Sequence, residues 1–244
     1  MGIKVAVIGA GGSMGQLATG LIEAADDLEL FASIGSKDSL DAMNGADVAL
    51  DFTVPGVSQQ VVEHAVANGL NVVVGTSGWS ADRITGIARL VADQPAIGVL
   101  FMPNFSLGSV LATSFAAMAA RFFDSIEIVE AHHAGKVDSP SGTATRTAEL
   151  MGQARASLGP VIAPHFDQRA RGQQVASIPI HSLRMQGLLA RQDVIFGGTG
   201  EVVTISHETF SNSSYEAGIL LALRAAPSTV GVVVGLDKLL DLSS

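Results

Sequence analysis

The sequence predicts an α/β protein with a Rossmann-like doubly wound parallel sheet, joined to a second α+β domain with an open mixed sheet. Three observations predict this fold. A strand-like run, a glycine-rich turn and a helix open the chain. Short apolar runs then alternate with helical segments, as in a parallel sheet with crossover helices. In the second half, several strand-like segments follow one another along the chain.

The glycine-rich turn is the first candidate binding site. Ile3–Ile8 is rich in β-branched residues, the next glycines have GxxGxxG spacing, and Gln16–Ala25 is typical of a helix. Glycine lets a backbone approach a pyrophosphate, whose charge a helix N-terminus stabilises. The alternative is a tight turn that binds no ligand. The pattern favours a dinucleotide site made by Gly9, Gly12, Ser13, Met14 and Gly15.

The end of the second strand bears on the choice of dinucleotide. Leu28–Ile34 is the predicted strand, and Gly35-Ser36-Lys37-Asp38 follows it. An acid that binds the ribose hydroxyls of NAD is expected at the strand end, and none stands there. Ser36 and Lys37 have the chemistry to accept a 2′-phosphate, although Lys37 can equally be a solvated loop residue. The sequence therefore favours NADPH, with NADH also used.

The rest of the first domain follows the same alternation. The predicted strands are Asp47–Phe52, Asn71–Val74 and Ile97–Met102, and the helices between them are Val57–Asn68 and Ser80–Ala92. Ligands of such sheets sit beyond the strand C-termini, where this chain carries glycine and small polar residues. A helix at Ser214–Ala226 and a strand at Val230–Val234 return to complete this sheet. The predicted boundaries are 1–105 with 214–244 for the dinucleotide-binding domain, and 106–213 for an inserted substrate-binding domain.

The inserted domain begins with a predicted helix at Leu107–Phe122. Its predicted strands are Ser125–Val129, Ser177–Arg184, Asp193–Gly197 and Glu201–Thr209, with a hairpin turn between the last two. Gly159–Gln174 is expected to be a mobile loop. Helices on one side would leave the other face of this sheet uncovered, and another subunit is the simplest way to bury it.

The most informative stretch is Glu130–Ala144, which joins the Ser125–Val129 strand to a predicted helix at Ala144–Arg155. Ser141, Gly142 and Thr143 offer hydroxyl and N–H groups at a helix N-terminus, which favours an anion. Lys136 adds a positive charge, and His132 or His133 can donate a proton near neutral pH. The stretch is therefore suited to hold a carboxylate and to protonate a group beside it.

Simpler interpretations of the same residues remain open. Adjacent histidines can be surface residues, and a Ser-Gly-Thr turn can simply cap a helix. A metal site is not expected, because the chain has no cysteine and because His132 and His133 would point to opposite sides of a strand.

Composition excludes several classes of function. Hydrophobic residues make up 48% of the 244 residues, which is ample for a buried core, and the net charge of −9 argues against nucleic-acid binding. Without cysteine there is neither a disulfide nor a thiol nucleophile. Gln94–Ala120 carries no charge, but its prolines and polar residues indicate strand, loop and core helix and not a membrane span. Met1–Lys4 leads directly into a strand and not into a signal peptide, so a cytoplasmic protein is expected.

The sequence Glu-Ala-His-His, followed after three residues by Asp-Ser-Pro-Ser-Gly-Thr-Ala, resembles the signature of the dihydrodipicolinate reductase family. The resemblance extends along essentially the whole chain. It implies reduction of 4-hydroxy-tetrahydrodipicolinate, or of its dehydrated form, with NADPH or NADH in lysine and diaminopimelate biosynthesis. It also implies a homotetramer assembled through the second sheet. Many relatives have a basic residue where Ser13 stands, so the strength of the NADPH preference is open.

The resemblance also implies roles for individual residues. His132 is the expected general acid, Lys136 pairs with the substrate, and Glu130 and Asp138 are assigned to loop structure. The residues expected to hold a substrate carboxylate are His133, Ser141, Gly142 and Thr143. The candidate cofactor contacts at the strand ends are Phe52, Thr53, Gly75, Thr76, Asn104 and Phe105, although the two phenylalanines can equally be core residues. Because cofactor and acid would lie on different domains, hinge closure is expected.

Two other classes of protein share parts of this pattern. One is a sugar or amino-acid dehydrogenase with the same two-domain plan, and the other is a dinucleotide sensor without catalysis. The Glu130–Ala144 cluster, with its anion-holding turn, argues against the dehydrogenase. A sensor has no need for His132 and Lys136 beside Ser141, Gly142 and Thr143.

Overall fold

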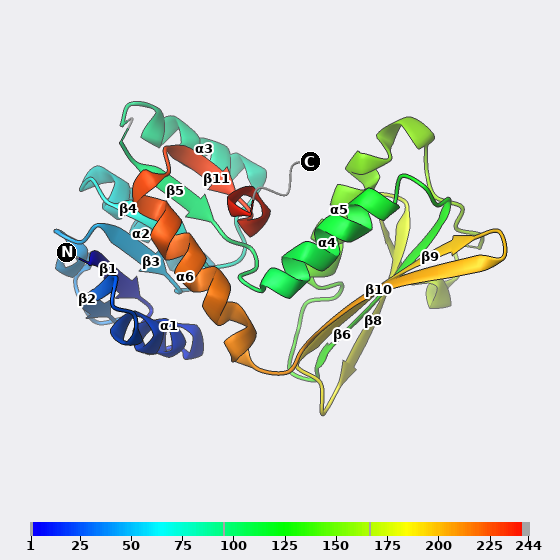
Figure 1. Ribbon diagram of the computed structural model, residues 1–244, viewed down its shortest axis with the longest axis horizontal. Coiled ribbons are helices and arrows are strands. Elements are labelled where there is room, and N and C mark those ends of the chain that lie inside the picture. Colours follow the sequence, from blue (N-terminus) through cyan, green and yellow to red (C-terminus); the bar gives the residue numbers. More distant parts are fainter. Residues whose placement is uncertain (1, 95, 166, 241–244) are drawn as a thin grey trace. The chain divides into compact units, whose positions relative to one another are not determined.

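The computed structural model describes residues 2–94, 96–165 and 167–240 (Figure 1). The chain divides into two compact units. The first unit runs as far as Leu107 and resumes at Tyr215, and the second unit is Gly108–Ser214. The second unit is therefore inserted in the first.

The first unit is built on a six-stranded sheet with the order β11-β5-β4-β3-β1-β2. Each neighbouring pair of these strands is parallel. The strands are β1 (Ile3–Ile8), β2 (Leu28–Ile34), β3 (Val48–Asp51), β4 (Asn71–Val74), β5 (Gly98–Phe101) and β11 (Gly231–Val234). The inner strands β3, β4 and β5 are short, almost wholly apolar runs, as expected for strands covered on both faces.

Helices cover both faces of this sheet. They are α1 (Ser13–Ala24), α2 (Pro55–Ala67), α3 (Ala81–Ala92) and α6 (Glu216–Ala225). Helices α2 and α3 bury Val61, Val62 and Ile87 against one face, and α1 packs beside α6. This arrangement confirms the predicted doubly wound sheet. The strand order reverses between β1 and β3, which is where such sheets bind their ligands.

Helix α1 begins at Ser13 and not at Gln16, so that prediction was wrong by three residues. A glycine inside a helix is unfavourable by about 1 kcal/mol relative to alanine, which is why the helical sequence pattern starts only after Gly15. Gly15 lies in the first turn because the helix packs there against the carbonyl of Gly9.

The second unit contains a five-stranded mixed sheet with the order β10-β9-β6-β8-β7. Strands β6 and β8 are parallel, and the other neighbouring pairs are antiparallel. The strands are β6 (Ser125–His133), β7 (Gln173–Val175), β8 (Ile178–Met185), β9 (Ala190–Gly198) and β10 (Glu201–Thr209). Helices α4 (Leu107–Ala119) and α5 (Gly142–Ala154) pack on one face of this sheet (Figure 1). Ile126, Ile128 and Phe196 of that face are almost completely buried.

The sheet differs from the sequence prediction in strands β6, β7 and β9, of which β9 begins at Ala190 instead of Asp193. Strand β7 was missed, and it adds a fifth strand at the edge through a two-residue turn in which Ala176 and Ser177 both have positive φ. Such turns usually contain glycine or asparagine, so this one carries no turn signal in the sequence. Strand β6 continues to His133 instead of ending at Val129, which places Glu130 and His132 in the sheet.

Short 3₁₀ segments complete the described chain. They are η1 (Leu40–Met43), η2 (Ala156–Leu158), η3 (Arg169–Arg171), η4 (Asn212–Tyr215), η5 (Ala226–Ser228) and η6 (Leu236–Leu239). Arg171, in the segment predicted to be a mobile loop, forms an ion pair with Glu127 of β6. Within the described ranges, none of the helices combines the length and apolar character that a membrane span requires.

Candidate active site

The glycine turn after β1 is shaped by backbone contacts. Gly9 has a φ of +85°, and a Cβ there would lie 2.4 Å from the carbonyl oxygen of Phe52. A Cβ on Gly15 would lie 2.2 Å from the carbonyl oxygen of Gly9, whereas Gly11 has open space around it. Gly12 is the N-cap of α1 and provides no side-chain cap, and the first turn contains no acid. An exposed, uncapped helix N-terminus beside a glycine turn fits a dinucleotide pyrophosphate.

The turn after β2 presents Ser36 and Lys37 to solvent. The carboxylate of Asp38 accepts a hydrogen bond from the backbone N–H of Gly35 at 2.8 Å, so this acid closes the turn. This contact holds the Asp38 side chain against its own turn. The exposed Lys37 ammonium is compatible with a 2′-phosphate.

The candidate contacts after β3, β4 and β5 come together. The rings of Phe52 and Phe105 meet edge to face with centroids 5.6 Å apart. A Cβ on Gly75 would lie 2.2 Å from the Phe52 ring, so glycine is required for this packing. Phe105 is 4% exposed, which makes it a core residue as well as a member of the predicted cofactor bed.

The polar candidates in the same region have structural partners. The Thr53 hydroxyl donates to Asp51 at 2.6 Å, and the side-chain oxygen of Asn104 accepts from the backbone N–H of Ser106 at 2.8 Å. Thr76 is nearly buried. These contacts fix the strand ends.

Asp51 organises this edge and was not singled out from the sequence. It is completely buried, and its carboxylate accepts hydrogen bonds from Thr53 and from the hydroxyl of Ser58. Ser58 in turn accepts a hydrogen bond from the indole of Trp79 at 3.0 Å. The carboxylate therefore ties the loops after β3 and β4 together. An acid at the end of a short apolar strand is the only sequence signal for this role.

The second candidate centre lies at the carboxyl ends of the parallel strands β6 and β8. Glu130 is completely buried there and accepts hydrogen bonds through both carboxylate oxygens. One oxygen lies 2.6 Å from Nδ1 of His132 and 2.9 Å from Arg184, and the other lies 2.9 Å from Arg184 and 3.1 Å from the backbone N–H of Ser141. The assignment of Glu130 to loop structure was therefore wrong, because it is the centre of the polar cluster.

Opposing effects set the pKa values of Glu130 and His132. Burial raises the pKa of Glu130, but hydrogen bonds from Arg184, Ser182, His132 and the Ser141 backbone outweigh burial and hold its pKa below the ordinary value. Burial lowers the pKa of His132 and outweighs the opposite effect of Glu130, while the charges of Lys136 and Arg184 lower it further. His132 is thus less readily protonated in the free protein than the sequence suggested.

Arg184 is the second residue that sequence reasoning missed. It lies opposite His132 in the β6–β8 register and donates to the backbone carbonyl of Asp138 at 2.6 Å as well as to Glu130. It thereby fixes the loop that carries Lys136. The Lys136 ammonium lies 2.7 and 2.8 Å from the two carboxylate oxygens of Asp138, so in this structure the lysine is already paired.

The predicted anion-holding turn is partly occupied by the protein itself. Ser141 is the N-cap of α5, and its hydroxyl accepts from the backbone N–H of Ala144 at 3.2 Å. Ser141 is 2% exposed, whereas Gly142 is exposed with open space around it. His133 is exposed, and its ring lies over Gly135 of the loop. Gly142 and Thr143 are thus the members of the turn that remain accessible.

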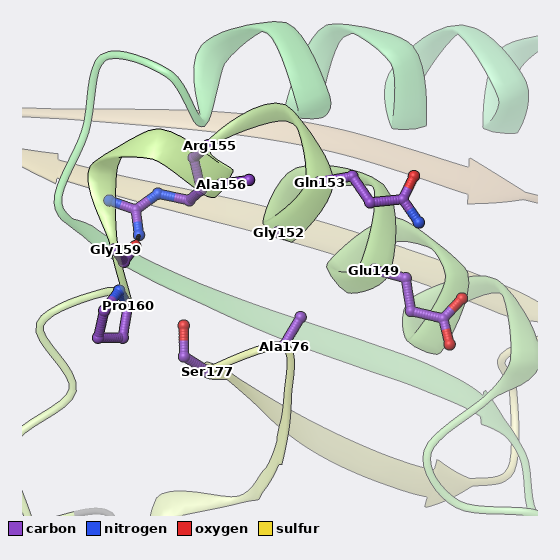
Figure 2. Close-up of a pocket in the computed structure, with 9 residues that line it drawn as sticks. All are labelled: Glu149, Gly152, Gln153, Arg155, Ala156, Gly159, Pro160, Ala176 and Ser177. Carbon is purple, nitrogen blue, oxygen red and sulfur yellow. Dashed lines mark hydrogen bonds between the residues drawn. The ribbon is translucent and has the colours of Figure 1, made fainter.

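A separate hollow of about 450 Å³ lies at the other end of α5 (Figure 2). None of the predicted site residues lines it. Its most polar member, Arg155, is 2% exposed and donates to the backbone carbonyls of Ala120 and Phe123 and to the Asp124 carboxylate. Glu149, Gln153 and Ser177 also line the hollow, and we assign it no role. Among the described residues, no three His, Asp or Glu side chains gather in a way that would hold a metal ion.

Comparison with known proteins identifies relatives of the whole chain. Residues 3–105 match the family model of the dihydrodipicolinate reductase N-terminus, and residues 108–240 match that of its C-terminus. The 4-hydroxy-tetrahydrodipicolinate reductase of Clavibacter michiganensis is 67% identical over 242 residues, which cover 99% of this chain and 87% of that protein. The enzyme of the same name from Streptomyces griseus is 44% identical over 247 residues and is covered to 99%, as is this chain.

Solved structures give the same result. Dipicolinate-bound dihydrodipicolinate reductase from Paenisporosarcina sp. TG-14 superposes with a TM-score of 0.82 at 30% identity, covering 98% of this chain and 99% of that one. Apo scyllo-inositol dehydrogenase from Lactobacillus casei has a TM-score of 0.62 at 12% identity and covers 98% and 92%, so it shares the fold alone. The resemblance seen in the sequence is confirmed, and the chain belongs to the dihydrodipicolinate reductase family.

Proposed function

We propose that this chain reduces 4-hydroxy-tetrahydrodipicolinate, or its dehydrated form, to tetrahydrodipicolinate with NAD(P)H in lysine and diaminopimelate biosynthesis. The observation that carries the proposal is a protonatable histidine beside a lysine and a helix N-terminus, in a chain 67% identical to a relative of that name. The dipicolinate-bound relative supports a small dicarboxylate as the ligand.

The proposed reaction transfers a hydride and a proton. The reduced nicotinamide, when bound, would supply a hydride to the ring carbon conjugated to the substrate imine and would become NAD(P)⁺. The electron pair of the ring C=C bond would move to the bond between the α-carbon and the imine carbon, and the imine pair would move to nitrogen, which gives an anionic enamine. A proton from Nε2 of His132 would then bond to the α-carbon, and the imine would be restored. His132 is left neutral and regains its proton from solvent. A general acid of this kind contributes on the order of 10²–10⁴-fold to the rate.

Substrate binding is proposed to raise the pKa of His132. In the free protein burial holds the pKa of His132 low, so the neutral ring predominates at neutral pH. A dicarboxylate placed beside the ring would favour the charged form and raise the pKa towards neutrality. A larger fraction of His132 would therefore be charged when substrate is present.

Lys136 and the first turn of α5 are proposed to hold the carboxylates. The Lys136 ammonium would exchange one of its contacts with Asp138 for a substrate carboxylate and would stabilise charge that develops on the ring. Gly142 and Thr143 would donate backbone N–H groups to the other carboxylate. We assign a supporting role in carboxylate binding to His133 and Ser141.

The dinucleotide is proposed to bind at the Gly9–Gly15 turn and along the ends of β3, β4 and β5. Its pyrophosphate would meet Gly12, Ser13 and Met14, with Gly9 and Gly15 shaping the turn. Lys37 and Ser36 would hold the 2′-phosphate of NADPH, and NADH would also be used. Hinge closure between the cofactor and substrate domains remains a prediction.

The open face of the second sheet is proposed to form the contacts of a homotetramer. Leu183, Met185 and Val202 are large hydrophobic residues of β8 and β10 that are between 46% and 68% exposed in the single chain. Burial of such side chains between subunits is favourable. We further propose a cytoplasmic location, which suits a biosynthetic reductase without disulfides.

The test is NADPH oxidation followed by absorbance. The preceding synthase generates the substrate in the cuvette from pyruvate and aspartate semialdehyde. Wild-type protein is compared with His132→Ala, Lys136→Ala and the control His64→Ala, since His64 lies on α2 and belongs to none of the proposed sites. We expect a loss of about a hundredfold or more in the first two variants and little change in the control.

Two further measurements separate the alternatives. Lys37→Ala is expected to raise KM for NADPH and not for NADH. Lys238→Ala is the control, because this exposed lysine follows β11, at the opposite edge of the sheet from β2. Tight dinucleotide binding without turnover of this substrate would instead favour a sensor or a dehydrogenase of another substrate.

A further inference from the structure

We infer that the buried Glu130–Arg184 pair is a positioning device that fixes the tautomer of His132 and couples it to the first turn of α5. The inference deepens the proposed function and rests on it. Neither residue is placed in contact with substrate, so both are positioning residues and not catalytic ones.

The tautomer follows from the hydrogen bonds. Two N–H groups of Arg184 and the backbone N–H of Ser141 bond Glu130, so its side chain is an ionised carboxylate that only accepts. Nδ1 of His132, 2.6 Å away, must then carry a hydrogen. Nε2 is the remaining ring nitrogen, and it is the atom that exchanges a proton with a ligand.

Arg184 extends the same device to the loop. Its guanidinium holds both oxygens of Glu130 at 2.9 Å, which fixes the plane of the carboxylate. It also donates to the backbone carbonyl of Asp138 at 2.6 Å. Through these contacts one ion pair joins the end of β6, the Lys136–Asp138 loop and the N-terminus of α5. These elements carry the proposed general acid His132, the proposed substrate contact Lys136 and the proposed carboxylate-binding turn of α5.

A purely structural role is the alternative. Breaking one partner of a buried ion pair is strongly destabilising, whereas replacing both partners by neutral residues is often tolerated. Loss of activity in a single variant would therefore prove little. A positioning role predicts that the tautomer of His132 changes when Glu130 is replaced, and that a double variant regains stability without regaining kcat. A purely structural role predicts neither.

The first test observes the ring directly. Protein with ¹⁵N-labelled histidine is titrated by NMR, and the His132 signals are assigned by their absence in His132→Asn. Wild-type His132 is expected to be the Nδ1–H tautomer when neutral. Glu130→Gln should convert it to the Nε2–H tautomer, because the amide orientation that keeps the bond from Ser141 turns its NH₂ towards Nδ1.

The same titration gives two opposite shifts. Glu130 raises the pKa of His132 and Arg184 lowers it. We therefore expect the pKa of His132 to fall in Glu130→Gln and to rise in Arg184→Met. Glu127→Gln is the matched control, since Glu127 lies on the opposite face of β6 and bonds Arg171 and His181. It should alter the signals of His181 and leave those of His132 unchanged.

The second test is kinetic. Glu130→Gln is expected to lower kcat by about ten- to hundredfold, the range for losing a partner that orients a functional histidine. KM for the substrate should hardly change, because the side-chain oxygen of the new glutamine can still accept from Ser141. The falling limb of the kcat–pH profile should move to lower pH with the pKa of His132.

The double variant Glu130→Gln with Arg184→Met separates position from stability. We expect its unfolding free energy to recover while kcat stays low. Recovery of kcat together with stability would overturn the inference, as would an unchanged His132 tautomer in Glu130→Gln. The NMR result needs no substrate, so it stands even if the wild type fails to turn over 4-hydroxy-tetrahydrodipicolinate and the proposed function is wrong.

Discussion

Substitution of Gly15 by alanine separates the structural glycine of the Gly9–Gly15 turn from the glycine that is proposed to face a dinucleotide. Gly15 lies in the first turn of α1, and a Cβ there would meet the carbonyl oxygen of Gly9 at 2.2 Å and the Cα of Ala10 at 2.7 Å. Both atoms are backbone, so no side chain can rotate away. The helix or the turn must move.

The magnitude follows from that contact. Real Cβ atoms essentially never approach a neighbour closer than 3.0 Å, so the helix must retreat from the turn by most of an ångström. Overpacking of this kind typically costs about 1–3 kcal/mol, and a rigid backbone partner puts Gly15→Ala at the upper end. For a chain of this size that corresponds to a fall in Tm of roughly 6–12 °C.

Two neighbouring glycines are matched controls. Gly20 lies in the same helix, is exposed and has no neighbour within 4 Å of the position that a methyl group would take, so Gly20→Ala should stabilise the helix by up to about 1 kcal/mol. Gly12 has ordinary negative φ, and a Cβ there would touch only the Gly9 carbonyl at 3.4 Å. Gly12→Ala should therefore change stability little, because the loss of a favourable N-cap residue is offset by the lower entropy of the unfolded chain. It should weaken dinucleotide binding, because its methyl group would occupy space proposed for the pyrophosphate.

The assay combines urea unfolding with NADPH titration by fluorescence. The expected order is loss of both stability and binding for Gly15→Ala, loss of binding alone for Gly12→Ala and neither loss for Gly20→Ala. Unchanged stability in Gly15→Ala would refute the packing argument. Unchanged NADPH affinity in Gly12→Ala would refute the placement of the pyrophosphate.

Three further predictions concern buried and charged groups. Ser58→Ala removes the hydroxyl that bridges a buried carboxylate and an indole, so the free energy of unfolding should fall by about 1–3 kcal/mol in urea. The pKa values of Glu130 and His132 both lie below their ordinary values, so the unfolded chain binds more protons than the folded one. The free energy of unfolding should therefore decrease as pH falls, first below about 6.5 through His132 and then below about 4.3 through Glu130. Urea unfolding at a series of pH values checks this, and a stability that rises on acidification would contradict it. Asp138→Asn removes the carboxylate that competes for Lys136, so dipicolinate should bind up to about fivefold tighter by calorimetry, the equivalent of an exposed ion pair. Weaker binding would instead make Asp138 a residue that positions the lysine.

The fold of the first unit was predictable because each of its elements carries its own signal. Strands β3, β4 and β5 are apolar on both faces, and Ser80 marks the start of α3. Helix α2 was predicted from Val57 but begins at Pro55, a residue that is favoured in the first turn of a helix. Such signals are local, so a single sequence contains them. Strand β7 has none, since its three residues are mostly exposed and its turn lacks glycine.

The residues of the Glu130–Ala144 stretch could be singled out from the sequence, but their connections could not. His132, Lys136 and Ser141 stand close together in the sequence and have distinctive chemistry. Arg184 is 54 residues from Glu130, and only the parallel pairing of β6 with β8 brings the two together. Because the two residues of this ion pair are far apart in the sequence, no local motif contains both.

That pairing also explains why a strand can end in charged and polar residues on its covered face. Glu130 sits between Ser182 of β8 and Gln192 of β9 in the sheet register, and His132 sits opposite Arg184. Each buried polar group on β6 therefore finds a partner on a neighbouring strand or on α5, which offsets the loss of hydration. The same contacts that make Glu130 tolerable in the sheet determine which ring nitrogen of His132 is free. The hydrogen bonds that stabilise the buried Glu130 carboxylate are thus the same ones that orient His132, the proposed proton donor.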